Sequence, residues 1–163
     1  MEFDLKGPYF EEVELLRKYI PDIAITTDIM VGFPSETEDD FNDTMQLVEK
    51  VKFSGAFTFI YSPRTGTPAA KMDEQIDEET SKTRIMKLID LQNSINREQS
   101  KNYQDKTIEI LCEGFDEKKQ AYLGRDTYGR MAYFKSEENL IGKFVNVKIT
   151  KTGGISLIGD VVL

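Results

Sequence analysis

Residues 26–41 place polar side chains where a strand ends and a helix begins. They read Thr-Thr-Asp-Ile-Met-Val-Gly-Phe-Pro-Ser-Glu-Thr-Glu-Asp-Asp-Phe. Gly32 allows the backbone to turn tightly or to approach a ligand, and Pro34 cannot donate to a sheet ladder, so the strand ends there. Because ligands bind at the carboxyl ends of strands in α/β folds, this edge is a candidate ligand site. A plain strand-to-helix turn within a core explains the motif by itself equally well.

The composition limits which other chemistry the chain can perform. The sequence has one cysteine, Cys112, and no histidine. An internal disulfide is therefore excluded, and the usual zinc or iron–sulfur ligand sets cannot be assembled. Ser-His-Asp and Cys-His catalysis are excluded for the same reason. We expect no catalytic residue and no metal ligand in this chain, and we expect Cys112 to be a small core side chain.

The charge of the chain is unevenly distributed. The formal net charge is −8; residues 1–102 hold 12 basic and 20 acidic side chains, whereas residues 103–163 hold 9 of each. An acidic front half is a poor match for a polyanion, so nucleic-acid contacts are expected on the back half or on a few placed basic residues. The sequence shows no apolar run of membrane-spanning length and no signal-peptide pattern over residues 1–20, which predicts a cytoplasmic protein.

Apolar spacing in the front half predicts alternating helices and strands. The predicted elements are helix 9–20, strand 23–31, helix 38–51 and strand 53–61. Thr37 and Asp40 form a capping-box pattern at the start of the second helix. Strand 23–31 is apolar on both parities, as in a parallel sheet that is buried on both faces. Two parallel strands cannot build such a sheet alone, so residues 1–76 are predicted to be a slice of a larger α/β barrel.

A long helical pattern follows that starts at Asp77 or Thr80 and predicts a connecting helix over residues 77–102. From Lys106 the apolar period changes from helical to two. Five short strand patterns follow, separated by turn signals such as Gly153-Gly154, over residues 106–113, 120–124, 130–135, 143–150 and 155–162. Five strands in about sixty residues predict a small closed β-barrel of OB-like size over residues 103–163.

Three motifs carry a family resemblance: residues 25–41 as given above, residues 56–70 (AFTFIYSPRTGTPAA) and residues 140–150 (LIGKFVNVKIT). In this order they closely resemble radical S-adenosylmethionine tRNA methylthiotransferases, above all the MiaB-type branch that acts on isopentenyladenosine. The resemblance implies that residues 1–76 are the last part of the radical-SAM (TIM-like) barrel and that residues 103–163 are a TRAM domain, a β-barrel that binds tRNA. Ser35 and Thr65 stand where family members commonly have glycine and proline.

The resemblance also implies cofactors that this chain cannot hold alone. The family carries one 4Fe-4S cluster on a CxxxCxxC motif and a second on three cysteines of a further N-terminal domain, and this sequence has neither set. The isolated chain is therefore predicted to be inactive and to need the missing N-terminal domains of the same protein as partners. Asp28, Gly32 and Glu36 lie on the motif that the family places beside S-adenosylmethionine. For Asp28, a hydrogen bond to the following loop is an equally good interpretation.

RNA contacts are expected from basic and aromatic side chains. Arg64, in a loop rich in proline and glycine, would hold a tRNA phosphate or the cofactor carboxylate, or be an ordinary surface arginine. In the predicted β-barrel, charge and stacking faces come from Arg125, Tyr128, Arg130, Tyr133, Phe134, Lys148 and Lys151. Some of the barrel's aromatic side chains must belong to its core. The RNA expected is the anticodon stem-loop of tRNA, and the affinity of the chain for it is expected to be weak.

Three classes of function remain open. The motifs favour the C-terminal portion of an enzyme that methylthiolates an isopentenyladenosine next to the anticodon. A stand-alone RNA-binding module is the second class, and it requires the acidic front half to fold without the missing strands. The third class is an adaptor that binds no RNA, which the zero net charge of residues 103–163 keeps open.

Overall fold

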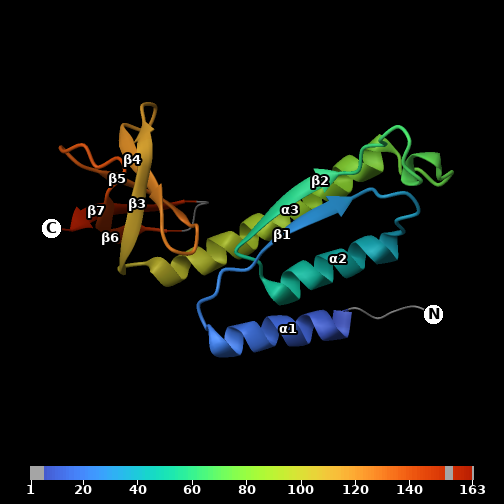
Figure 1. The fold of residues 1–163 in the computed structure, drawn as a ribbon, viewed down its shortest axis with the longest axis horizontal. Coiled ribbons are helices and arrows are strands. Elements are labelled where there is room, and N and C mark those ends of the chain that lie inside the picture. The colour runs from blue at the N-terminus through green and yellow to red at the C-terminus, as the bar shows by residue number, and fades with distance from the viewer. Residues whose placement is uncertain (1–5, 153–155, 163) are drawn as a thin grey trace. The chain divides into compact units, whose positions relative to one another are not determined.

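The computed structural model describes residues 6–152 and 156–162, and it divides the chain between Ile95 and Asn96 into two compact units. Each unit is described by itself (Figure 1). The predicted connecting helix exists as α3 (Glu78–Ser100), but its residues up to Ile95 belong to the first unit. None of the described helices is both long enough and apolar enough to cross a membrane.

The first unit alternates helices and strands, as the apolar spacing predicts. Its elements are α1 (Lys6–Tyr19), β1 (Thr26–Val31), α2 (Glu38–Val51), β2 (Gly55–Ile60), the 3-10 turn η1 (Ala69–Lys71) and most of α3. The two strands are parallel and in register from Thr26 opposite Gly55 to Val31 opposite Ile60. They form a two-stranded sheet among the described residues.

Two of the helices begin at side-chain caps. The capping box predicted for α2 is present: the Thr37 hydroxyl accepts from the Asp40 N–H at 3.1 Å, and the Asp40 carboxylate accepts from the Thr37 N–H at 2.9 Å. Asp77 precedes α3, and its carboxylate accepts from the Thr80 hydroxyl at 2.7 Å and the Thr80 N–H at 2.8 Å. These hydrogen bonds, above all the one from the hydroxyl, lower the pKa of Asp77. The caps fix where both helices start.

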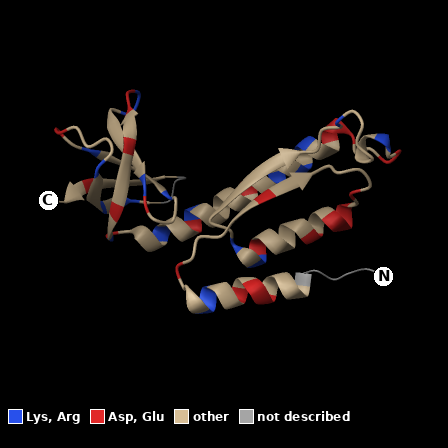
Figure 2. Ribbon diagram, in the orientation of Figure 1, with Lys and Arg blue, Asp and Glu red and all other residues tan. Residues whose placement is uncertain are grey.

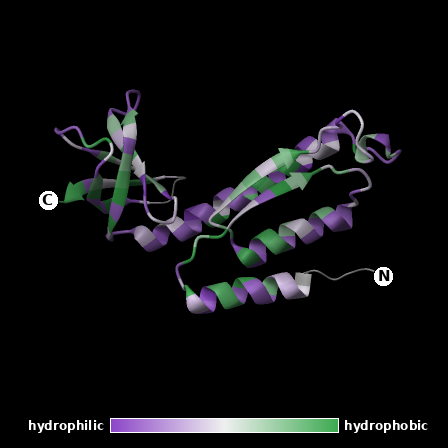
Figure 3. Ribbon diagram, viewed as in Figure 1, coloured by the Kyte–Doolittle hydropathy of each residue, from purple (hydrophilic) through white to green (hydrophobic). Residues whose placement is uncertain are grey.

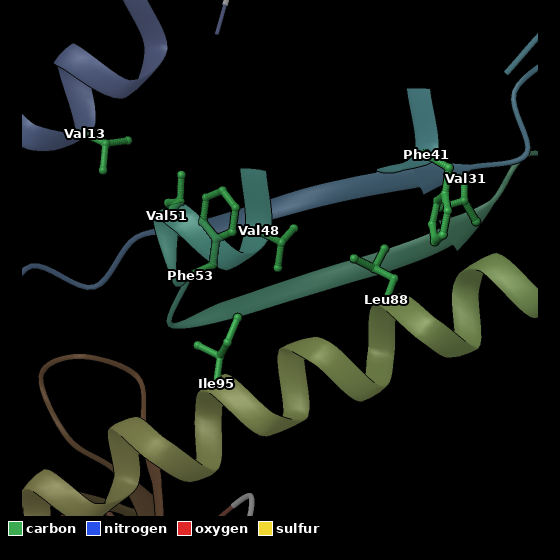
Figure 4. Packing of buried hydrophobic residues seen from close by; sticks show 8 residues of the cluster. All are labelled: Val13, Val31, Phe41, Val48, Val51, Phe53, Leu88 and Ile95. Atoms are coloured by element: carbon green, nitrogen blue, oxygen red, sulfur yellow. The ribbon is translucent and has the colours of Figure 1, made fainter. Parts of the chain in front are cut away.

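The core of the first unit lies between one face of the sheet and its helices (Figure 4). Its buried members are Val13, Val31, Phe41, Val48, Val51, Phe53, Leu88 and Ile95. Gln92 of α3 adds a hydrogen bond from its amide to the Phe53 carbonyl at 2.8 Å. Hydrophobic side chains therefore reach this core from all three helices, from β1 and from the segment before β2.

The other face of the two strands is open. Figure 3 shows apolar residues along both strands, and Met30, Phe57 and Phe59 are 53%, 67% and 51% exposed. Only one face of β1 is covered in this chain, in agreement with the expectation that two parallel strands cannot build a sheet buried on both faces. Its side chains alternate between the helix-covered face and the open face, because a strand presents successive side chains to opposite sides.

The second unit is a closed barrel of five strands, as predicted. After the last turn of α3 and the 3-10 turn η2 (Lys101–Tyr103) come β3 (Thr107–Asp116), β4 (Ala121–Arg125), β5 (Met131–Lys135), β6 (Phe144–Lys151) and β7 (Leu157–Val162). The strand order around the barrel is β3-β4-β5-β7-β6, with β5 and β7 parallel and the other pairs antiparallel. The turn predicted at Gly153-Gly154 and the first residue of the last predicted strand, residue 155, lie outside the described residues.

The barrel interior is filled by small and branched apolar side chains. Its fully buried members include Ile110, Cys112, Phe134, Val147 and Leu157. Burial raises the pKa of the Cys112 thiol, which keeps it protonated and unreactive at neutral pH. Cys112 is therefore a core side chain, as expected.

Candidate functional site

The loop after β1 is held tightly against α3. Gly32 has φ +74°, and a Cβ atom at this position would lie 2.4 Å from the Ser81 hydroxyl oxygen. The left-handed backbone favours glycine, and the close approach leaves little room for a side chain. The structure thus explains Gly32 by the turn and by its contact with α3, while a role beside a cofactor remains a proposal.

Glu36 makes hydrogen bonds within the same loop. Its carboxylate accepts hydrogen bonds from the N–H groups of Gly32 and Phe33, the latter at 3.1 Å. Arg84 of α3 lies 3.4 Å from the other carboxylate oxygen and donates to the Glu36 carbonyl at 3.0 Å. Sequence reasoning missed Arg84. Its signal is its place on the buried stripe of α3, three residues after Ser81 and four before Leu88, where an arginine needs a partner.

Asp28 and Arg64 lie apart from this cluster of contacts. Asp28 is exposed on the open face of the sheet, in register with Phe57. Arg64 is exposed in the loop after β2, and its carbonyl accepts from the Thr67 N–H at 3.1 Å and the Thr67 hydroxyl at 2.8 Å. The structure therefore brings Gly32 and Glu36 together and leaves the side chains of Asp28 and Arg64 facing solvent.

Ser35 occupies a strained position in this loop. It has φ +70°, in the left-handed region that favours glycine, and its N–H donates to the Glu74 carbonyl at 2.8 Å. Ser35→Gly keeps that hydrogen bond and removes a backbone cost of about 1–2 kcal/mol, at the expense of a more flexible unfolded chain. We expect the free energy of unfolding to rise by up to about 1 kcal/mol, measured by urea denaturation followed by circular dichroism.

The control for this variant is Ser62→Gly. Ser62 is also exposed in a loop, but its φ is not positive. Glycine there increases only the freedom of the unfolded chain, so this variant is expected to lose stability. Equal changes in both variants would show that the backbone of Ser35 is not strained.

On the barrel, Tyr133 stands in a row of outward-facing side chains. It alternates with the buried Ala132 and Phe134 on β5, so it points to the outer face. Its register partner on β7 is Ile158, which is in turn the partner of Lys151 on β6. The Lys119 ammonium lies 3.7 Å from the centre of the Tyr133 ring, a cation–π contact.

A second row runs across the same three strands. Lys135 on β5, Asp160 on β7 and Lys148 on β6 are consecutive register partners. Together with the first row they define what we call the lysine face: Lys119, Tyr133, Lys135, Lys148 and Lys151. One carboxylate, from Asp160, stands among four ammonium groups. These register partners gather more basic than acidic side chains, although residues 103–163 are neutral as a whole. Figure 2 shows both basic and acidic residues on the barrel.

The remaining expected RNA contacts on the barrel are engaged in its own structure or lie in a turn. Arg125 forms an ion pair with Glu113 at 2.6 Å. Arg130 is half-buried, donates to the Gln99 side chain at 3.2 Å and lies 5.1 Å from the Tyr103 ring. Tyr128 is exposed in the turn between β4 and β5, where its N–H donates to the Asp126 carboxylate at 3.0 Å.

The structure adds Lys119 and Lys135 to the predicted set. Lys119 lies in the turn between β3 and β4, where its N–H donates to the Asp116 carboxylate at 3.0 Å. The adjacent pair Lys118-Lys119 is the sequence signal for basic side chains in this turn, although Asp116 and Glu117 precede them. Nothing in the sequence indicated its contact with Tyr133, because the two residues meet only through strand pairing.

A closed five-stranded barrel of this size with one basic face is the architecture of a small RNA-binding module. The family model of the TRAM domain matches residues 101–162, which include the whole described barrel. The second unit is therefore a TRAM domain.

Curated relatives extend the comparison to nearly the whole chain. The chain is 45% identical over 158 residues to tRNA-2-methylthio-N(6)-dimethylallyladenosine synthase of Acetivibrio thermocellus, covering 96% of this chain and 33% of the relative. The protein of that name from Thermoanaerobacter sp. (strain X514) is 46% identical over 158 residues, covering 96% and 34%. That of Carboxydothermus hydrogenoformans is 49% identical over 144 residues, covering 88% and 33%.

The chain spans about a third of the length of the curated relatives it matches. It matches the C-terminal third of these relatives, and its residues 101–162 match the TRAM domain. This confirms the family that the three sequence motifs indicate.

Proposed function

We propose that this chain supplies the tRNA-binding C-terminal portion of an enzyme that methylthiolates an isopentenyladenosine next to the anticodon. The observation that carries the proposal is the identity of 45–46% over 158 residues with synthases named for that modification. In this proposal the first unit is the last part of a larger radical-SAM barrel. The open face of β1 and β2 supports that role, because exposed aromatic side chains on a sheet need a covering layer.

We place the RNA contact on the lysine face. Its four lysines neutralise phosphates without reading sequence, and the Tyr133 ring offers a surface on which an unpaired base stacks. Single-stranded loops are the part of RNA whose bases are free to stack, so the anticodon stem-loop is the proposed target. Arg64, Tyr128 and Arg130 stay as proposed contacts outside this face, whereas Arg125 is paired with Glu113 and is not proposed as a contact.

The cofactors of the proposed enzyme fit the described residues unequally. No group of three or more His, Cys, Asp or Glu side chains among them is placed to hold a metal ion, so we derive no step through an iron–sulfur cluster. For S-adenosylmethionine, the exposed Asp28 carboxylate stands among Met30, Phe57 and Phe59 on the open face and would accept a hydrogen bond from the cofactor's ammonium group. In the longer enzyme the cofactor would supply the radical chemistry, and Asp28 would be the residue of this chain that holds its ammonium group.

The double variant Lys148→Ala/Lys151→Ala tests the RNA contact. Binding to an anticodon stem-loop, measured by fluorescence anisotropy over a salt series, is expected to weaken about tenfold. The log–log salt slope is expected to flatten by about 1.4, because two phosphate contacts are lost at about 0.7 each on single strands. Tyr133→Ala is expected to weaken binding by about 1–3 kcal/mol while leaving the slope unchanged.

Arg125→Ala is the matched control, because it removes a cation that is already paired with Glu113. It is expected to change affinity less than threefold, since an ion-paired side chain has little charge left to neutralise a phosphate. A larger loss in Arg125→Ala than in the double lysine variant would place the RNA on the β3–β4 side of the barrel. No RNA binding by the parent chain would favour the adaptor.

A further inference from the structure

We propose that Arg84 is a positioning residue that fixes the loop of residues 32–36 in one conformation. The inference rests on the proposed function in one respect, namely that this loop borders the cofactor in the complete enzyme. The contacts that fix the loop are all made by residues of this chain. Arg84 lies on α3, more than forty residues from the loop along the sequence, and contacts it through Glu36.

The Glu36 carboxylate occupies the position that an anionic ligand would take in this loop. One of its oxygens accepts from both the Gly32 and the Phe33 N–H groups. Consecutive backbone N–H groups that converge after a strand form an anion site in many α/β proteins. Here the protein's own side chain fills that site, so these two N–H groups are not available to a phosphate or a carboxylate of a ligand.

A carboxylate in this position needs a counter-charge. The side chains of Glu36 and Arg84 are only 12% and 7% exposed, and an unpaired charge at such burial is strongly unfavourable. Arg84 meets this need twice, through the ion pair at 3.4 Å and through its hydrogen bond to the Glu36 carbonyl at 3.0 Å. Without the guanidinium, the carboxylate would turn toward water and release the two N–H groups.

Arg84 also ties the loop to the start of α2. Its second terminal nitrogen lies 3.4 Å from the Glu38 carboxylate, and the guanidinium lies 5.6 Å from the centre of the Phe41 ring. Ser81, one turn earlier on α3, lies against Gly32. The first turns of α3 therefore determine the shape of the carboxyl end of β1, and a ligand at this edge is recognised by groups other than the Gly32 and Phe33 amides.

Hydrogen exchange of single amides tests this role. In Arg84→Met, which keeps most of the side-chain volume, the Gly32 and Phe33 amides are expected to exchange at least about tenfold faster than in the parent. Their proton chemical shifts are expected to move upfield, because they lose a charged acceptor. Amides in the middle of β4 and β6 are expected to be unchanged.

Lys82→Met is the matched control, because Lys82 is exposed on the same helix and pairs with Glu78 four residues earlier. Arg84→Lys is expected to give exchange about threefold faster than the parent, since lysine keeps the charge but cannot bind the carboxylate and the carbonyl together. If Arg84→Met does not fold, the same exchange measurement on Arg84→Lys tests the proposal. Exchange and shifts equal to those of Lys82→Met in the folded Arg84 variant would overturn the proposal. The measurement involves no RNA or cofactor, so a failure of the proposed function would not affect it.

Discussion

Gly124→Ala is expected to prevent the second unit from closing into a barrel. Gly124 is buried on β4 opposite Cys112, and a Cβ atom there would lie 2.1 Å from the Leu111 carbonyl oxygen and 2.8 Å from its carbon. Both atoms belong to the backbone of the paired strand, so neither can move without breaking the β3–β4 ladder. We expect a loss of more than about 4 kcal/mol in the free energy of unfolding of this unit.

Gly114→Ala controls for the substitution itself. Gly114 lies on β3, where the register with β4 shifts between Cys112 and Gly114. Its added Cβ atom would meet the Leu123 side chain at 4.0 Å, an ordinary contact. We expect a change of less than about 1 kcal/mol, in either direction. Dispersed amide resonances from β3–β7 in two-dimensional NMR check both variants. A folded barrel in Gly124→Ala would mean that β3 and β4 can separate at this point.

Local patterns were sufficient to predict the helices and strands and the β-barrel of the second unit. The helical spacing before Pro21, the capping box at Thr37 and the change of period near Lys106 all reflect interactions within a few residues. The need for glycine at position 124 could not be predicted from the sequence. It arises from the backbone of the paired strand β3, about thirteen residues earlier in the chain. Steric requirements of this kind follow from pairing and register.

In the candidate sites, too, the sequence predicted local features and missed contacts between distant residues. The sequence placed Gly32 and Glu36 at a strand end because the strand-to-helix switch is local. It could not indicate that Glu36 is held by Arg84, since that contact joins residues 48 positions apart. On the barrel, charge alone gave equal weight to Arg125 and Lys151. The pairing of strands distinguishes them, because it places Glu113 beside Arg125 and leaves Lys151 exposed near Tyr133.

Leu88→Ala is expected to destabilise the first unit by about 2–5 kcal/mol, the usual cost of removing a buried leucine side chain together with the cavity left behind. Leu88 is fully buried in α3, in the same cluster as Val31 and Phe41 (Figure 4). The sheet of this unit is covered on one face, so few other contacts compensate for the loss. A cost of this size is comparable with the whole stability of a small domain.

The matched control is Met86→Ala, two residues earlier on the same helix, where the side chain is 57% exposed. Alanine is a better helix former than methionine and removes little buried surface here, so we expect a change within about 0.5 kcal/mol. Urea denaturation followed by residue-resolved NMR separates the two units, with barrel amides as the internal reference. Equal midpoints for both variants in the amides of β1 and α2 would show that α3 does not stabilise the core of the first unit. The stability of this core would then have to come from contacts with another part of a longer protein.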